Sequence, residues 1–115
     1  MVAVQLEYRS VSTSFAVPDE LEPVTRHPKV TPPGEDMRYH HALCYGCGAD
    51  AVNGLHVRVI AGEGATSTAT MTVPQWMEGG PGVIHGGLLS AAFDEVMGTT
   101  ALLIGVPVVT GHLEI

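Results

Sequence analysis

The chain is poor in positive charge. Its 115 residues contain five Lys and Arg against twelve Asp and Glu, which gives a formal net charge of -7 at pH 7. A nucleic acid or an anionic membrane surface is bound through a basic face of the protein, because Lys and Arg supply the attraction. The composition therefore argues against both, and we expect neither nucleic acid nor membrane as a partner.

Cysteine is also scarce, with only Cys44 and Cys47 in the sequence. The N-terminus lacks the basic start and the apolar run of a secretory signal peptide. The apolar stretch over residues 96–109 is interrupted by two glycines and by Pro107, unlike a bilayer-spanning segment. We therefore expect a cytoplasmic protein, in which the two cysteines are reduced thiols or part of a turn motif and do not form a stabilising disulfide.

What the chain does contain is enough apolar material for one folded domain. Hydrophobic residues make up 45% of the sequence, and a chain of this size forms one domain at most. Residues 1–39 are expected to be an N-terminal extension, partly an extended arm or linker, because five prolines fall between residues 18 and 34. Partial alternation over residues 2–17 predicts a strand there. Residues 40–115 form the expected domain.

Within that domain the pattern changes from strand to helix. Residues 55–60 alternate like a half-buried strand, and the Thr-rich residues 65–73 alternate again, which predicts an antiparallel hairpin. Residues 75–82 form a loop with the only tryptophan, a helix runs from about residue 87 to residue 104, and residues 108–115 open another strand. The fold class is α+β.

The expected helix is apolar on nearly all sides. Eleven apolar residues between 88 and 104 spread around its whole circumference, so it must be enclosed on most sides. That cover takes a curved sheet of at least about four strands. The chain supplies three at most, so the remaining cover must come from elsewhere.

The start of this helix is suited to binding a negatively charged oxygen atom. Pro81 and three glycines precede Leu88, so the helix N-terminus falls near residues 85–87. The free N–H groups at such an end carry roughly half a positive charge and hold an anion or a developing oxyanion. Glycine at this place lets a substrate approach the main chain closely.

Four segments of the chain form a recognisable set of motifs: Cys44-Tyr45-Gly46-Cys47-Gly48, Asn53-Gly54-Leu55, Glu78-Gly79-Gly80-Pro81-Gly82-Val83-Ile84-His85-Gly86-Gly87 and Asp94-Glu95-Val96-Met97-Gly98. Together they resemble the hotdog-fold acyl-CoA thioesterases of the PaaI-like group, and the resemblance spans about residues 40–115. It implies a hotdog fold, in which an antiparallel β-sheet wraps around a long central helix. It also implies homodimers or tetramers that hydrolyse acyl-CoA thioesters without metal or other cofactor.

The resemblance also implies roles for four residues. Gly86 matches the residue whose N–H polarises the thioester carbonyl, and Asp94 matches the catalytic carboxylate. His85 matches the residue that shapes the turn. Thr110 aligns with a hydroxyl residue that helps to place the attacking water in some members.

The sequence departs from the family pattern at two places. Some members have an asparagine six residues before the histidine, where this chain has Gly79. The water-positioning role is then unfilled or taken by Gln75 or Glu78. The family's sheet also continues with further strands after the position of Ile115. We therefore expect C-terminal strands to be missing from the chain, which is either a fragment or an unusually short member.

Helix geometry indicates that the site is shared between subunits. Gly86 and Asp94 lie eight residues apart, about 12 Å along a helix at 1.5 Å per residue, which is too far for both to reach one carbonyl carbon. A two-fold pairing of antiparallel helices would bring Asp94 of one subunit toward Gly86 of the other. The sequence therefore predicts a dimer with two composite sites.

Several residues have more than one interpretation. The family spacing favours Asp94 over Glu95 for the chemistry, with Glu95 capping a neighbouring loop or pairing with a basic residue. His85 is preferred as a turn residue hydrogen-bonded to the backbone over a general base. Ser90 is preferred as a packing residue over a nucleophile, because no histidine lies at a spacing that would activate it.

The candidate substrate-binding residues are Gly82, Gly87, Trp76 and Glu95. Trp76 and the neighbouring Met77 are read first as core or interface side chains and second as a wall of the acyl or pantetheine channel.

A zinc site is the alternative role for the cysteines. Cys44 and Cys47 with His40 and His41 offer four nitrogen and sulfur ligands. A second ligand pair at finger-like spacing is missing, and adjacent histidines point apart in an extended chain. A tight turn at Gly46 and Gly48 is therefore preferred, and no metal is expected.

Two other functions stay open at this point. A hotdog protein that binds acyl-CoA without hydrolysing it is the main alternative, favoured by the missing asparagine. A hotdog dehydratase or hydratase would show a histidine five residues after the aspartate, where this chain has Thr99.

Overall fold

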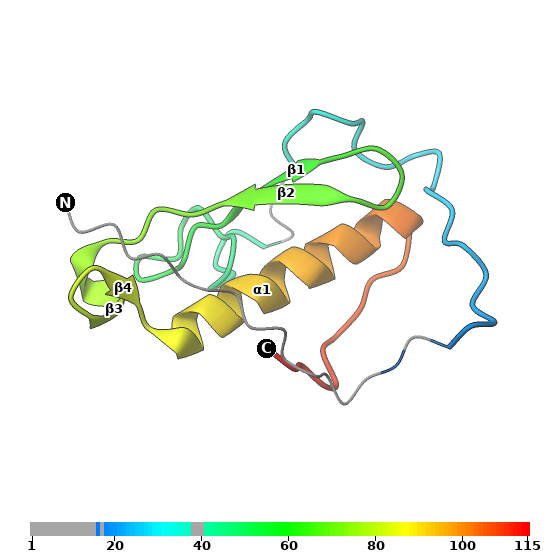
Figure 1. The fold of residues 1–115 in the computed structure, drawn as a ribbon. Coiled ribbons are helices and arrows are strands. Elements are labelled where there is room, and N and C mark those ends of the chain that lie inside the picture. The colour runs from blue at the N-terminus through cyan, green and yellow to red at the C-terminus, as the bar shows by residue number, and fades with distance from the viewer. Residues whose placement is uncertain (1–15, 17, 38–40) are drawn as a thin grey trace.

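The computed structural model describes residues 16, 18–37 and 41–115; the strand expected over residues 2–17 and the side chain of His40 lie outside this part. The described residues form an α+β fold, as expected. Its elements are β1 (Arg58–Ala61), β2 (Ser67–Thr70), the 3₁₀ helix η1 (Gln75–Met77), β3 (Glu78–Gly80), β4 (Val83–Ile84), α1 (Gly86–Ala101) and the 3₁₀ helix η2 (Leu102–Ile104). Figure 1 shows the β1–β2 hairpin lying along one side of α1, with β3 and β4 beside the start of the helix.

The predicted hairpin is confirmed. Strands β1 and β2 pair antiparallel, with Val59 opposite Ala69. Gly64 has a positive φ of 58° in the turn between them, a conformation that glycine adopts without strain. Alternation in the sequence therefore identified the pairing, although the strands are shorter than the alternating segments.

The chain before the domain continues this small sheet. Residues 34–37 run along the other edge of β1, where the Met37 N–H donates to the Val59 carbonyl at 2.8 Å and the Ala61 N–H donates to the Glu35 carbonyl at 3.0 Å. The Met37 side chain is buried in the core. Both edges of β1 are therefore occupied.

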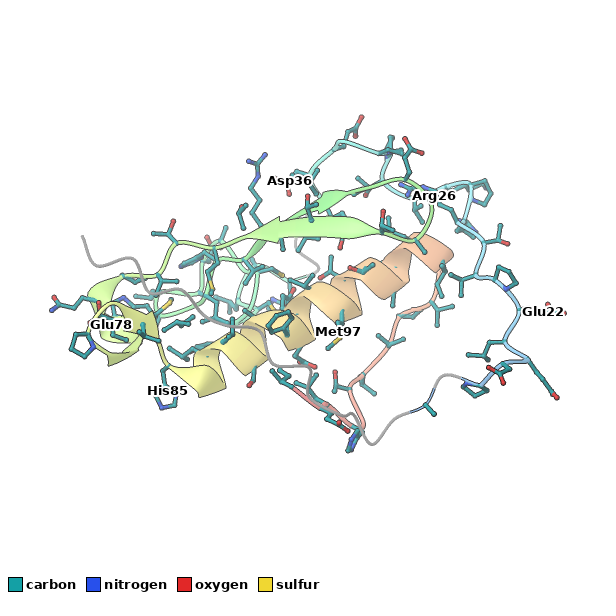
Figure 2. The ribbon with its side chains drawn as sticks, in the orientation of Figure 1. Glu22, Arg26, Asp36, Glu78, His85 and Met97 are labelled. Carbon is teal, nitrogen blue, oxygen red and sulfur yellow. The ribbon has the colours of Figure 1, made fainter. Side chains whose placement is uncertain are left out.

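Residues 18–33 contain turns but no helix or strand, as the prolines predict. They are held by the Arg26 guanidinium, which donates to the carbonyls of Gly62 and Gly64, both at 2.7 Å, and to the Thr31 carbonyl. Hydrogen bonds from a charged donor contribute about 1.5–3 kcal/mol each. The His27 N–H donates to the Leu103 carbonyl at 2.8 Å. The arm is therefore fixed to both the hairpin turn and the end of the helix (Figure 2).

The core lies between the hairpin and α1. Its buried side chains are Met37, Leu55, Val57, Val59, Ala61, Met77, Ala92 and Leu103. A polar link adds to this packing: the Thr100 hydroxyl donates to the Val96 carbonyl at 2.6 Å and lies 2.5 Å from the Ser67 hydroxyl of β2. Since a hydroxyl has one proton, Ser67 is the donor to Thr100.

The opposite side of α1 is not covered. Leu89, Phe93 and Met97 are 37%, 46% and 49% exposed, and their spacing of four residues places them on one line along the helix, which we call the open stripe. Figure 2 shows Met97 on the side of α1 away from the hairpin. The described residues thus leave an apolar helix face in solvent, as the sequence predicts.

By length and composition, Gly86–Ile104 would also pass as a segment that crosses a membrane. The core helix of a soluble protein meets the same criteria. Asp94 and Glu95 lie near the middle of this segment, and a carboxylate at the centre of a bilayer costs about 2.5–3.5 kcal/mol. Because of the two carboxylates, burial of this helix against protein costs less than burial in a lipid bilayer.

The predicted strand over residues 108–115 is wrong. After Gly105, which ends η2 with a φ of 79°, the chain returns along α1 without strand structure (Figure 1). A strand needs a neighbour with free backbone groups. Both edges of β1 are occupied, and the segment lies against the helix, away from β2.

The buried core predicts which side chains destabilise the fold when they are shortened to alanine. Leu55 is 1% exposed and Val52, three residues earlier, is 91% exposed. Leu55→Ala should lower the free energy of unfolding by about 2–5 kcal/mol through loss of packing and a residual cavity. Val52→Ala should stay within about 0.5 kcal/mol. Urea unfolding at one protein concentration measures both, and equal losses would contradict the described core.

Candidate functional site

His85 fixes the start of α1. Its Nδ1 accepts a hydrogen bond from the Gly87 N–H at 3.0 Å, and its carbonyl accepts from the N–H groups of Leu88 and Leu89 at 3.0 and 3.1 Å. Its own N–H donates to the Met77 carbonyl at 2.8 Å. The ring is therefore the N-cap of the helix, as expected of a turn residue hydrogen-bonded to the backbone.

At this helix end the N–H group of Gly86 is available to a ligand. In the part of the chain that the structure describes, its N–H has no hydrogen-bond acceptor, whereas the next three N–H groups are bonded to His85. A methyl group at Gly86 would meet nothing within 4 Å. A ligand oxygen can therefore reach this N–H, at the end of the helix where the macrodipole favours negative charge.

The other two glycines have conformational and packing roles. Gly82 lies in the turn between β3 and β4 with a φ of 72°. A methyl group at Gly87 would lie 3.2 Å from Nδ1 of His85, so this glycine makes room for the ring over the helix end. The structure therefore accounts for Gly82 by its backbone conformation and for Gly87 by the space it leaves to His85.

The departure at Gly79 also has a packing reason. A methyl group at Gly79 would lie 2.9 Å from Cα of His85, a distance at which the backbone must shift. An asparagine at this position does not fit the local arrangement. Glu78, which is exposed, lies next to it at the same end of the molecule as His85 (Figure 2).

Asp94 is half-buried on the side of α1 that the C-terminal segment approaches. Its Oδ1 accepts a hydrogen bond from the Thr110 hydroxyl. The two residues line one cleft of about 480 Å³, together with Glu95, Gly98, Thr99, Leu102, Pro107, Val108 and Val109. The structure therefore brings two of the predicted catalytic residues together, in a cleft that is largely apolar.

The two groups expected to act on the carbonyl, the Gly86 N–H and the Asp94 carboxylate, are kept apart within one chain. Gly86 and Asp94 both belong to the continuous helix α1, so their main chains are separated by about 12 Å along its axis. The described residues contain no turn or kink in α1 that would shorten this distance. One chain therefore supplies either the N–H donor or the carboxylate to a given carbonyl carbon.

Glu95 is oriented differently from Asp94. Its Oε2 accepts a hydrogen bond from Cys44 Sγ at 3.4 Å and its Oε1 accepts from the Thr99 hydroxyl at 3.2 Å. This agrees with the expectation that Glu95 contacts a neighbouring loop. Successive helix residues point about 100° apart, so Asp94 and Glu95 have different hydrogen-bond partners although both line the same cleft.

Sequence reasoning missed the contact between Glu95 and the cysteine loop. Cys44 and Glu95 lie 51 residues apart. The signal was present in Gly46, because a methyl group there would lie 2.3 Å from Oε2 of Glu95. A glycine between two cysteines was interpreted as a turn residue, and it is also the place where a carboxylate packs.

Trp76 and Ser90 lie outside the cleft. Trp76 is 57% exposed, which rules it out of the core of this chain, whereas the neighbouring Met77 is buried there. The Ser90 hydroxyl donates to the Gly86 carbonyl at 2.9 Å, an ordinary helix contact of serine. This agrees with its expected packing role.

Comparisons with protein-family models, with curated proteins and with solved structures found no match to this chain. A functional interpretation therefore depends on the geometry described above and on the resemblance in the sequence motifs.

The capping role of His85 can be tested separately from activity. His85→Ala removes the acceptor for the Gly87 N–H and should lower the free energy of unfolding by about 1 kcal/mol. His85→Asn restores a strong N-cap and should remain close to the wild type in stability. Thermal and urea unfolding of the two variants measure the difference, and an asparagine variant as unstable as the alanine variant would contradict the capping role.

Proposed function

We propose that this protein is an acyl-CoA thioesterase of the hotdog class, which hydrolyses its substrate at a site shared between two copies of the chain. The observation that carries this proposal is the open Gly86 N–H at the start of α1, with a half-buried carboxylate, Asp94, two turns further along the same helix. One group can polarise a carbonyl and the other can activate water.

The open stripe supports the pairing of two helices. Gly86 and Asp94 are separated by roughly 80° around the helix axis, and the exposed Leu89 and Phe93 lie between them along the chain. A two-fold axis at the level of Ser90 sets Gly86 of one antiparallel helix at the level of Asp94 of the other, and buries the apolar side chains between them. The same contact removes the exposed apolar face and completes the site.

The chemistry at such a site follows from the two groups. The thioester carbonyl oxygen accepts from the Gly86 N–H, which stabilises the oxyanion that forms when water adds to the carbonyl carbon. The Asp94 carboxylate takes a proton from that water and returns it to the departing thiolate as the carbon–sulfur bond breaks. The products are a carboxylic acid and coenzyme A. Thr110, bonded to Asp94, orients the carboxylate.

The described fold is compatible with the hotdog arrangement. A hairpin, extended by residues 34–37, lies over one side of a long helix, and the outer edge of β2 has no strand partner among residues 18–37 and 41–115. In the proposed assembly, a homodimer or a dimer of dimers, further strands and a second helix provide the missing cover. Acyl-CoA is the proposed partner in the cytoplasm, with no metal or other cofactor in the hydrolytic step.

A second candidate is an acyl-CoA-binding protein without hydrolytic activity. Gly79 favours it, because the packing of Gly79 on His85 leaves no side chain there to hold a water molecule. The two functions are distinguished by measuring binding and hydrolysis on the same acyl-CoA panel. Saturable binding with no release of free thiol above the uncatalysed rate would establish the second function.

The two neighbouring carboxylates provide a matched pair of variants. Asp94→Asn should reduce thioester hydrolysis at least about 100-fold, because it keeps the shape of the side chain and removes the base. Glu95→Gln should reduce it far less, since Glu95 is bonded to Cys44 and Thr99. Free thiol released from acyl-CoA measures both rates. Equal losses, or a larger loss for Glu95→Gln, would contradict the assignment.

The shared site can be tested by subunit exchange. Gly86→Ala has space for its methyl group within the chain, so the variant should fold while the methyl group crowds the substrate oxygen and lowers turnover. When Gly86→Ala and Asp94→Asn proteins are mixed and exchanged, each heterodimer has one site with both defects and one with neither. Activity should then rise toward half of the wild-type value per heterodimer.

Proven exchange without any gain in activity would place both groups in one subunit. A stable monomer of 12.1 kDa with full activity would do the same. The exchange itself is followed by native mass spectrometry of differently tagged chains, so a negative result is not due to failed mixing.

A further inference from the structure

Three side chains of the types that can bind a metal ion meet beside α1. The atoms are Sγ of Cys44, Sγ of Cys47 and a carboxylate oxygen of Glu95, and all of them lie within 4.8 Å of one another. All three residues are half-buried. They come from one loop and one helix that are far apart in sequence, so the fold itself creates the cluster.

The three ligand atoms lie within 4.8 Å of one another, and one pair is already at the distance that a metal ion imposes. In a tetrahedral zinc site with zinc–sulfur bonds of about 2.3 Å and a zinc–oxygen bond of about 2.0 Å, two sulfur ligands lie about 3.8 Å apart and a sulfur and an oxygen about 3.5 Å apart. Sγ of Cys44 and Oε2 of Glu95 are already 3.4 Å apart. An ion therefore needs only small side-chain movements to be bound by all three.

The loop that carries the cysteines is held by its backbone. The Gly48 N–H donates to the Cys44 carbonyl at 2.8 Å, and the Cys44 N–H donates to the His41 carbonyl at 3.0 Å. A methyl group at Gly48 would lie 2.4 Å from the Ala42 carbonyl oxygen, and one at Gly46 would lie 2.3 Å from the Glu95 carboxylate. The two glycines thus permit both the tight loop and the approach of the carboxylate.

The cluster also has an outer partner and a route to solvent. Thr99 is buried and donates to the second oxygen of Glu95 at 3.2 Å, and partners of this kind orient metal ligands. A cleft of about 880 Å³ reaches Cys47, with Asp36 and His56 on its wall. An ion can therefore enter from the cysteine side.

We propose that Cys44, Cys47 and Glu95 bind one Zn²⁺ ion. Two thiolates and one carboxylate form a soft, negatively charged set of donors, which suits Zn²⁺ and disfavours Mg²⁺ and Ca²⁺, whose ligands are oxygen atoms. Three protein ligands leave the fourth position of a tetrahedral ion to solvent. The net charge of -7 raises the concentration of cations near the protein above that in the surrounding solution.

The sequence pattern does not predict this site, because the second ligand pair of a zinc finger is missing. The structure supplies the third ligand from α1 instead, 48 residues after Cys47. The proposed site differs in its groups from the proposed hydrolysis, which uses Gly86, Asp94 and Thr110. Glu95 also lines the cleft beside Asp94, so Zn²⁺ binding and thioester hydrolysis are measured separately.

The test measures metal binding by the full chain. The protein is reduced, freed of metal by a chelator and titrated with Zn²⁺ in competition with a chromophoric chelator. One ion should bind per chain, with release of protons from the two thiols. Co²⁺ should give a thiolate-to-metal charge-transfer band and the strong visible absorption of a four-coordinate ion. Cys44→Ser, Cys47→Ser and Glu95→Gln should each weaken Zn²⁺ binding at least about 100-fold.

Two further variants separate ligands from neighbours. Thr99→Val should weaken binding about 10–100-fold, because it removes the hydrogen bond that orients Glu95. Asp94→Asn removes the same charge as Glu95→Gln at the next residue and should change the affinity by no more than about fivefold through electrostatics alone.

Three results would overturn the proposal. The first is wild-type protein that binds no Zn²⁺ at one per chain, which would leave the cysteines as a turn bonded to Glu95. The second is Glu95→Gln with wild-type affinity. The third is a Co²⁺ spectrum without a thiolate band. If a cysteine variant fails to fold, the wild-type Co²⁺ spectrum and the comparison of Glu95→Gln with Asp94→Asn still decide the question.

Discussion

Burial of the helix α1 is the constraint on which the rest of the structure depends. Its apolar side chains spread around the whole axis, whereas one hairpin covers only one side. The arm of residues 18–37 and the core residues Leu55 and Met77 complete that side. The open stripe is the remainder. In the proposed dimer a second copy of the helix covers it, since the two copies bring equal apolar area and the contact closes on itself.

The pair Asp94–Glu95 shows how one helix can bring two carboxylates to two different partners. Neighbouring helix residues point about 100° apart, so one carboxylate is bonded to Thr110 and the other to Cys44, while both residues line one cleft. The chain therefore places two negative charges beside different hydrogen-bond donors within a single turn of α1. Each charge has hydrogen-bond donors beside it, which lowers the cost of keeping it half-buried.

Local sequence patterns predicted much of this fold, whereas contacts between residues far apart in the sequence were hardly predicted. Alternation identified the hairpin, and the glycines before Leu88 located the helix start within one residue. The strand expected near Val108 failed because the segment lies against the helix, away from the edge of β2 that is free among the described residues, and no local pattern reveals that placement. The contact between Glu95 and Cys44 was missed for a similar reason: it depends on how α1 is rotated against the cysteine loop. Gly79 was recognised as unusual, but its packing on His85 needed coordinates.

The Arg26 contacts have a consequence for how the sequence can vary. Among the described residues, the guanidinium bonds to main-chain carbonyls, those of Thr31, Gly62 and Gly64, and a carbonyl is present whatever the side chain. Divergence at Thr31 therefore leaves the contact intact, while a lysine in place of Arg26 would lose the planar fork that bonds these oxygens. The side-chain part of the arm's attachment is thus encoded at one codon, whereas the main-chain bond from His27 to Leu103 does not depend on it. Loss of the Arg26 contact in a descendant would be visible as that one change.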